Sequence, residues 1–67
     1  MRVIDINGKE REVEYAKRVP HQVPDAQGVM YTSFYVEVLI IGPRGPRVEW
    51  YPIEDFMTKN PGVILGN

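Results

Sequence analysis

The 67-residue chain contains no cysteine and only one histidine. The absence of cysteine excludes disulfide bonds and cysteine-ligated zinc sites, and one histidine cannot form a histidine-based metal cluster. No apolar run approaches the roughly 18 residues that span a bilayer, and residues 1–5 lack the apolar core of a signal peptide. We therefore expect a cytoplasmic protein with no cofactor or metal, stabilised by tight packing or by self-association.

Neither sign of charge is in clear excess. Eight basic and nine acidic residues are interspersed, and the formal net charge is −1. A nucleic-acid-binding domain usually shows a basic excess or a concentrated basic stripe. Hydrophobic residues make up 43% of the chain, which is ordinary for a folded domain. The length allows one small domain, residues 1–67, that buries only about 60% of its unfolded surface.

No catalytic or phosphate-binding motif is present. His21 lies between prolines without a matched carboxylate, and Ser33 lacks the Gly-x-Ser-x-Gly elbow of a nucleophile. The alternating carboxylates of residues 10–14 are typical of a solvated strand face that discourages edge pairing. The sequence therefore predicts a non-enzymatic protein.

Residues 2–6 and 10–19 read as two strands joined by Asn7-Gly8, a strong hairpin signal. A two-residue type I′ turn would pair Ile4 with Arg11 and collect the aliphatic residues on one face. A three-residue loop would improve charge pairing but scatter the apolar side chains. Burial of an apolar side chain is worth about 1.5–3 kcal/mol and an exposed charge pair roughly 0.2–1 kcal/mol, so we expect the two-residue loop.

Two longer runs, Val29–Ile41 and Arg47–Tyr51, are rich in β-branched and aromatic residues and flank the turn Gly42–Pro46. Pairing Ile41 with Arg47 would place Val38 opposite Trp50 inside the core and leave Tyr51 on the outer face. The first run is long for a flat strand, so a bend or bulge is expected near residues 32–33.

The remaining segments complete a five-stranded order. Residues 20–28 read as a loop, residues 52–59 as one or two helical turns, and residues 63–65 as a short closing strand. This element order resembles that of an SH3-like small barrel, although no sequence motif of that class is present. The expected fold is mainly β: a small five-stranded SH3-like barrel or strongly bent antiparallel sheet with one short helical turn before the last strand.

An apolar and aromatic outer face is the first candidate for function. Its expected members belong to the central hairpin: Tyr31, Tyr35, Leu39, Ile41 and Tyr51. Exposed aromatic residues suit a groove for an extended peptide or a stacking platform for bases. The same residues could instead lie under the helical turn Ile53–Met57 or contact a second subunit.

Basic residues are the second candidate. Arg44 and Arg47 project from the central turn, and with Lys17 and Arg18 they could contact phosphates. They could equally be solvated surface charges, which often contribute nothing measurable.

These observations favour a small interaction module that binds another protein through the aromatic face and the residue 20–28 loop, with a homodimer as a further possibility. Size, cysteine content and the lack of targeting signals suit a bacterial or phage accessory protein. The alternative is a nucleic-acid-binding small barrel that uses its basic residues on phosphates and its tyrosines on bases.

Overall fold

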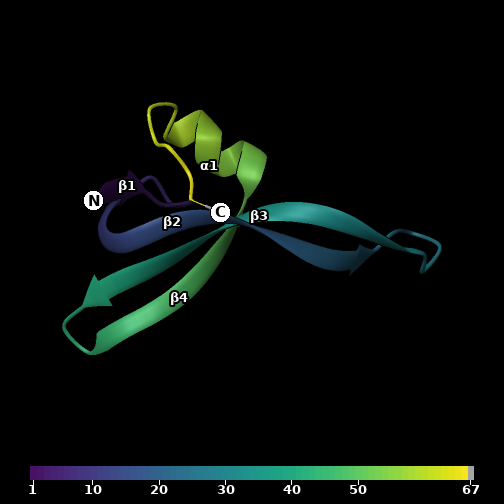
Figure 1. Ribbon diagram of the computed structural model, residues 1–67, viewed down its shortest axis with the longest axis horizontal. Helices are drawn as coiled ribbons and strands as arrows, with labels where there is room; N and C mark the ends of the chain where they lie inside the picture. Colours follow the sequence, from purple (N-terminus) through teal and green to yellow (C-terminus); the bar gives the residue numbers. More distant parts are fainter. Residues whose placement is uncertain (67) are drawn as a thin grey trace.

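The computed structural model describes residues 1–66 and shows a mainly β protein with one short helix (Figure 1). Four antiparallel strands form one open sheet in the order β1-β2-β3-β4. The elements are β1 (Arg2–Ile4), β2 (Glu10–Pro24), β3 (Met30–Gly42), β4 (Gly45–Pro52) and α1 (Ile53–Lys59).

The prediction of a mainly β fold is confirmed, but the described residues form neither a closed barrel nor a fifth strand. Residues 63–65 are irregular, and only Gly66 makes a parallel bridge, to Lys17 of β2. The bridge consists of two hydrogen bonds, from Gly66 N to Ala16 O and from Arg18 N to Gly66 O, each 3.0 Å long.

Helix α1 covers one side of the sheet, which we call the helix-side face (Figure 1). Pro52 precedes the helix, and Glu54 and Asp55 lie in its first turn, where the helix dipole favours acidic residues. The Phe56 ring stacks on Tyr51 with 6.1 Å between ring centroids. The core beneath the helix consists of eight buried residues: Val3, Val13, Ala16, Val36, Val38, Ile40, Tyr51 and Phe56.

Asn60 joins the end of the helix to the first strand. Its Oδ1 accepts a hydrogen bond from Ile4 N at 2.7 Å, and its Nδ2 donates to Ile4 O at 2.8 Å and to Phe56 O at 3.0 Å. The side chain is buried. Its hydrogen-bond partners offset the cost of removing a polar amide from water.

The first turn differs from the expected type I′ hairpin. Asp5 N donates to Lys9 O and Gly8 N donates to Asp5 O, which gives a three-residue loop with Gly8 at φ 80°. Asp5 is buried, and its carboxylate accepts hydrogen bonds from Asn7 N and Lys9 N. Its Oδ2 also lies 3.2 Å from Arg11 Nε, an ion pair in which the N–H does not point at the oxygen. The local Asp5 hydrogen bonds thus outweigh the apolar sorting that favoured the two-residue loop, and Ile6 is left half exposed.

The same turn occurs a second time, where the sequence predicted a loop. Asp25 N donates to Val29 O, Gly28 N donates to Asp25 O, and Gly28 has φ 82°. The Asp25 carboxylate again accepts two backbone N–H groups, from Gln27 and Val29. The prediction of a loop over residues 20–28 is therefore wrong: β2 runs to Pro24, and only a tight turn separates it from β3.

Beyond β4, β2 and β3 continue as a two-stranded ribbon, residues 19–34, which we call the arm (Figure 1). The radius of gyration is 12.9 Å. A compact domain of this length would have about 11 Å. The arm carries one charged residue, Asp25, in a chain that has 17. It therefore projects from the body of the protein without the charged surface typical of exposed strands.

The strand register corrects two further predictions. Ile41 pairs with Pro46 and Glu37 pairs with Trp50, one residue away from the expected alignment. A one-residue slip reverses the faces of a strand, so Tyr51 is in the core and Trp50 is 49% exposed. The irregularity in the sheet lies in β2, between Val13 and Ala16, rather than near residues 32–33 of β3.

Candidate functional site

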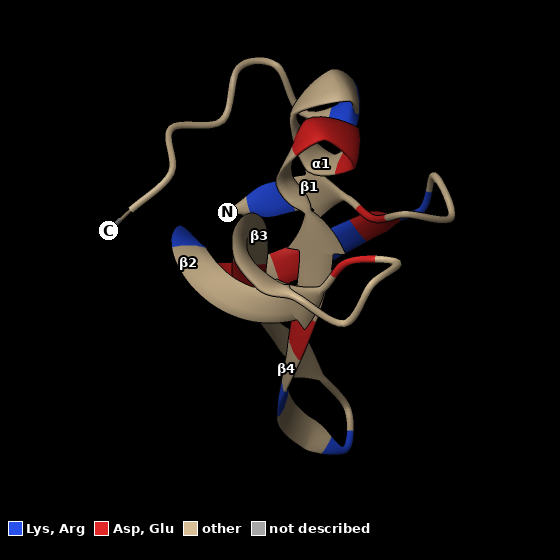
Figure 2. Ribbon diagram, turned by 90° about the vertical axis from the view of Figure 1, so that its right-hand side faces the viewer, with Lys and Arg blue, Asp and Glu red and all other residues tan. Residues whose placement is uncertain are grey.

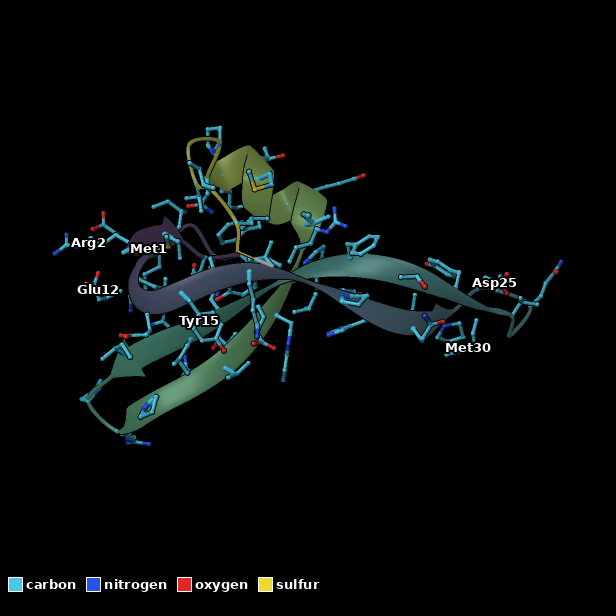
Figure 3. All side chains as sticks on the ribbon, in the orientation of Figure 1. Met1, Arg2, Glu12, Tyr15, Asp25 and Met30 are labelled. Carbon is cyan, nitrogen blue, oxygen red and sulfur yellow. The ribbon has the colours of Figure 1, made fainter. Side chains whose placement is uncertain are left out.

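The sheet has a second face, opposite the helix, which no other described element covers (Figures 1 and 3). We call it the open face. It receives odd-numbered side chains of β3 and even-numbered side chains of β4, because Glu37 pairs with Trp50. Four of its large apolar side chains are exposed: Tyr31, Ile41, Val48 and Trp50.

Three rings from three strands meet on the open face. The His21 ring of β2 stacks on Tyr35 of β3, with centroids 4.7 Å apart. The Trp50 ring of β4 meets His21 edge-on at 5.9 Å. These contacts link β2, β3 and β4 and hold the half-exposed indole in a defined position.

Glu37 lies at the centre of this face. Its carboxylate accepts hydrogen bonds from the Tyr15 hydroxyl at 2.8 Å and from Trp50 Nε1 at 3.0 Å. Lys17 Nζ is 3.4 Å away. The Tyr15 hydrogen bond, the Trp50 hydrogen bond and the lysine together lower the pKa of Glu37, and the same Tyr15 hydrogen bond raises the pKa of Tyr15. The open face is therefore nearly charge-balanced at its centre and apolar toward its ends.

The structure places four of the five predicted face residues together: Tyr31, Tyr35, Leu39 and Ile41. Tyr51 was placed wrongly. It is 6% exposed on the helix-side face, and its hydroxyl donates to Glu49. Burial and this neighbouring carboxylate raise the pKa of Tyr51 well above its usual value. Of the two alternatives for covering this face, the helical turn of residues 53–57 is excluded, because α1 packs on the other side.

The four predicted phosphate-contacting residues do not converge. Lys17 and Arg18 are consecutive in a strand and point to opposite faces, Lys17 toward Glu37 and Arg18 over the Phe34 ring at 4.1 Å. Arg47 Nη2 lies 2.9 Å from Glu49 Oε2. Arg44 lies in the β3–β4 turn, at the bottom of Figure 2. The basic residues thus form no single patch.

Sequence reasoning missed Trp50, Val48 and His21 as members of the open face. The strand prolines carried a usable signal. A proline has no N–H, so it must turn its nitrogen away from the neighbouring strand. Pro46 and Pro52 both occupy even positions, which means that odd-numbered residues of β4 bond to β3. Pro20 and Pro24 likewise make the odd-numbered residues of β2 bond to β3, and the observed register pairs these with odd-numbered residues of β3. Even-numbered residues of β3 must therefore bond to β4, which excludes the register that paired Ile41 with Arg47.

Residues 1–66 contain no group of three or more histidine, cysteine or carboxylate side chains placed to hold a metal ion. The helix of seven residues is too short to cross a bilayer, and the described part of the chain has no other membrane-spanning candidate. The open face offers ring stacking, exposed apolar surface and hydrogen bonding around Glu37. Comparison with protein-family models, curated proteins and solved structures finds no match for this chain.

Proposed function

We propose that this protein is a non-enzymatic interaction module that binds another protein through the open face of its sheet. The observation that carries the proposal is Trp50: its indole is held by Glu37 and His21, yet it is 49% exposed on an uncovered face. Tryptophan and tyrosine are the residues most often found at the energetic centre of protein interfaces.

The surroundings of Trp50 support the same function. Tyr31, Ile41 and Val48 extend the apolar surface, whereas Lys17 and Glu37 neutralise each other. Interface cores are depleted in charge and enriched in aromatic residues. Because the indole is already positioned, little side-chain entropy would be lost when a partner covers it.

Affinity capture followed by titration tests the proposal. The wild type, Trp50→Ala and Ile64→Ser are used as baits in cells that make the protein. Ile64 is 89% exposed in the irregular C-terminal segment, so Ile64→Ser is a matched loss of an exposed apolar side chain away from the open face.

We expect the wild type and Ile64→Ser to capture a protein that Trp50→Ala does not capture. The purified pair is then titrated while the fluorescence of Trp50, the only tryptophan, is recorded. A shift of the emission to shorter wavelength on binding supports the proposal. Partners retained equally by all three baits would contradict it.

A further inference from the structure

The first turn combines two features that favour deamidation, an exposed asparagine and a glycine after it. Asn7 is exposed, and Gly8 has no side chain to shield its nitrogen and lies in open space. In such a pair the glycine nitrogen can attack the side-chain amide of the asparagine. Asn60, the other asparagine among residues 1–66, precedes Pro61, whose nitrogen carries no hydrogen and cannot react in this way. Asn7 is therefore the single candidate for this chemistry in the described part of the chain.

The reaction exchanges ammonia for water in two steps. Gly8 N forms a bond to Asn7 Cγ while the bond from Cγ to Nδ2 breaks, and the amide takes the proton of Gly8 N and leaves as ammonia. Water then opens the five-membered imide. Cleavage between Gly8 N and Cγ gives aspartate, whereas cleavage between Gly8 N and the main-chain carbonyl carbon gives isoaspartate, in which the main chain runs through the side chain. Either product adds one negative charge.

The folded turn holds the reacting atoms apart. Gly8 N donates to Asp5 O at 2.9 Å, which closes a turn over residues 5–8. Neither central residue has a positive φ, so the turn is of type I, in which the second central residue, here Asn7, has ψ of about 0°. At this ψ the Gly8 nitrogen lies beside Asn7 N, whereas closure of the imide needs it beside Asn7 Cβ. The reaction therefore requires a rotation that breaks the hydrogen bond of Gly8 N.

The Asp5 carboxylate keeps the turn closed. Its Oδ1 accepts hydrogen bonds from Asn7 N and Lys9 N, each 2.9 Å long. Asp5 is buried, so opening the turn would leave its carboxylate with fewer partners, and an unsatisfied buried group is costly. These bonds oppose the rotation that Asn7 needs in order to react.

We propose that Asn7 is a site of spontaneous deamidation, suppressed by the closed first turn and modified when this turn opens. The aspartate product keeps the main chain and can close the turn again. The isoaspartate product has an additional main-chain atom and cannot restore all the hydrogen bonds around Asp5. Formation of isoaspartate therefore makes the opening of the turn irreversible. The inference does not rest on the proposed function, because the first turn is not part of the open face.

The second turn offers a matched control within the chain. It repeats the first turn at residues 25–29, with the same hydrogen bonds and with Asp25, Gln27 and Gly28 in the equivalent positions. Glutamine has one more methylene group than asparagine, so its imide would be a six-membered ring, which forms more slowly. This turn lies at the tip of the arm, where Asp25 is exposed (Figure 3). Substitutions there test the role of the turn without disturbing the core.

Peptide mapping by mass spectrometry, during incubation at mildly alkaline pH, measures the reaction. Trypsin cleaves after Arg2 and Lys9 and releases Asn7 in the peptide of residues 3–9. The wild type in urea should deamidate at Asn7 at least about tenfold faster than the folded wild type, because folding limits the time that the turn spends open. Equal rates in urea and in buffer, or no reaction at Asn7 in urea, would overturn the proposal.

Variants of the second turn test the hydrogen bonds directly. Gln27→Asn places an Asn-Gly pair in this turn, and the introduced asparagine should react slowly while the turn is closed. Adding Asp25→Ala removes the acceptor of two backbone N–H groups, so the introduced asparagine should deamidate about tenfold faster. The rate at Asn7 should not change, which makes Asn7 an internal control for folding. An unchanged rate at position 27 after Asp25→Ala, or equal acceleration at both positions, would overturn the proposal.

Discussion

Trp50 and Glu37 face each other on β4 and β3, and the indole Nε1–H donates to the Glu37 carboxylate at 3.0 Å. This pair lies on the open face, whereas the next residue, Tyr51, lies in the core. Two adjacent aromatic residues therefore have opposite environments, and their substitutions should have opposite consequences.

Trp50→Ala should lower the free energy of unfolding by about 1 kcal/mol, since the indole is half exposed and loses one hydrogen bond. Tyr51→Ala should lower it by about 3 to 5 kcal/mol, as for other aromatic residues removed from a core. Urea denaturation measures both. The reverse order of the two losses would show that the register of β4 is wrong.

Glu37 should make stability sensitive to acid. Hydrogen bonds from Tyr15 and Trp50 lower its pKa in the folded protein, so protonation opposes folding. Its contribution is complete above the usual glutamate pKa of about 4.3 and is lost as the pH falls through the lowered folded pKa. An NMR titration of the Glu37 carboxyl group should show the lowered pKa. Trp50→Phe, which keeps a ring but removes the N–H, should move it back toward the usual value, and a titration that this variant does not move would contradict the role of the indole.

Asn60→Ala should destabilise the protein more than the same substitution at an exposed asparagine. The change leaves the backbone N–H and C=O of Ile4 without their partners in a partly buried position. Each unsatisfied buried group costs about 1 to 3 kcal/mol. Thermal unfolding monitored by circular dichroism measures the loss. Asn7→Ala, in the exposed first turn, is the control and should change the midpoint little.

Short oligonucleotides should not bind at physiological salt. The formal net charge is −1, and Lys17 and Arg47 are already paired with carboxylates. Fluorescence anisotropy with generic single- and double-stranded oligonucleotides at two salt concentrations measures this. Binding that weakens steeply as salt rises would instead indicate contacts with phosphates.

The sequence was informative wherever side-chain type alone decides the outcome. β-Branched runs predicted the central strands, and the proline followed by acidic residues predicted the helix, which the structure places at Ile53–Lys59. Val38 was expected inside the core, and it is buried.

The errors arose where two patterns compete. In β4 the even positions hold Val48 and Trp50 and the odd positions hold Glu49 and Tyr51, so apolar character favours burying the even set. The structure buries Tyr51, which stacks on Phe56 of the helix. The sequence predicts this helix but does not specify which face of the sheet it covers. In the arm, Pro20 and Pro24 suggested a loop, although prolines at outward edge positions are compatible with a strand.

The most direct test of the open face is the affinity of a purified captured partner for the wild type and for Trp50→Ala, with Ile64→Ser as the control. An aromatic residue at the centre of an interface contributes about 2 kcal/mol or more, so Trp50→Ala should weaken binding by roughly 30-fold, whereas Ile64→Ser should bind as the wild type does. Equal dissociation constants for the wild type and Trp50→Ala would show that the partner binds elsewhere.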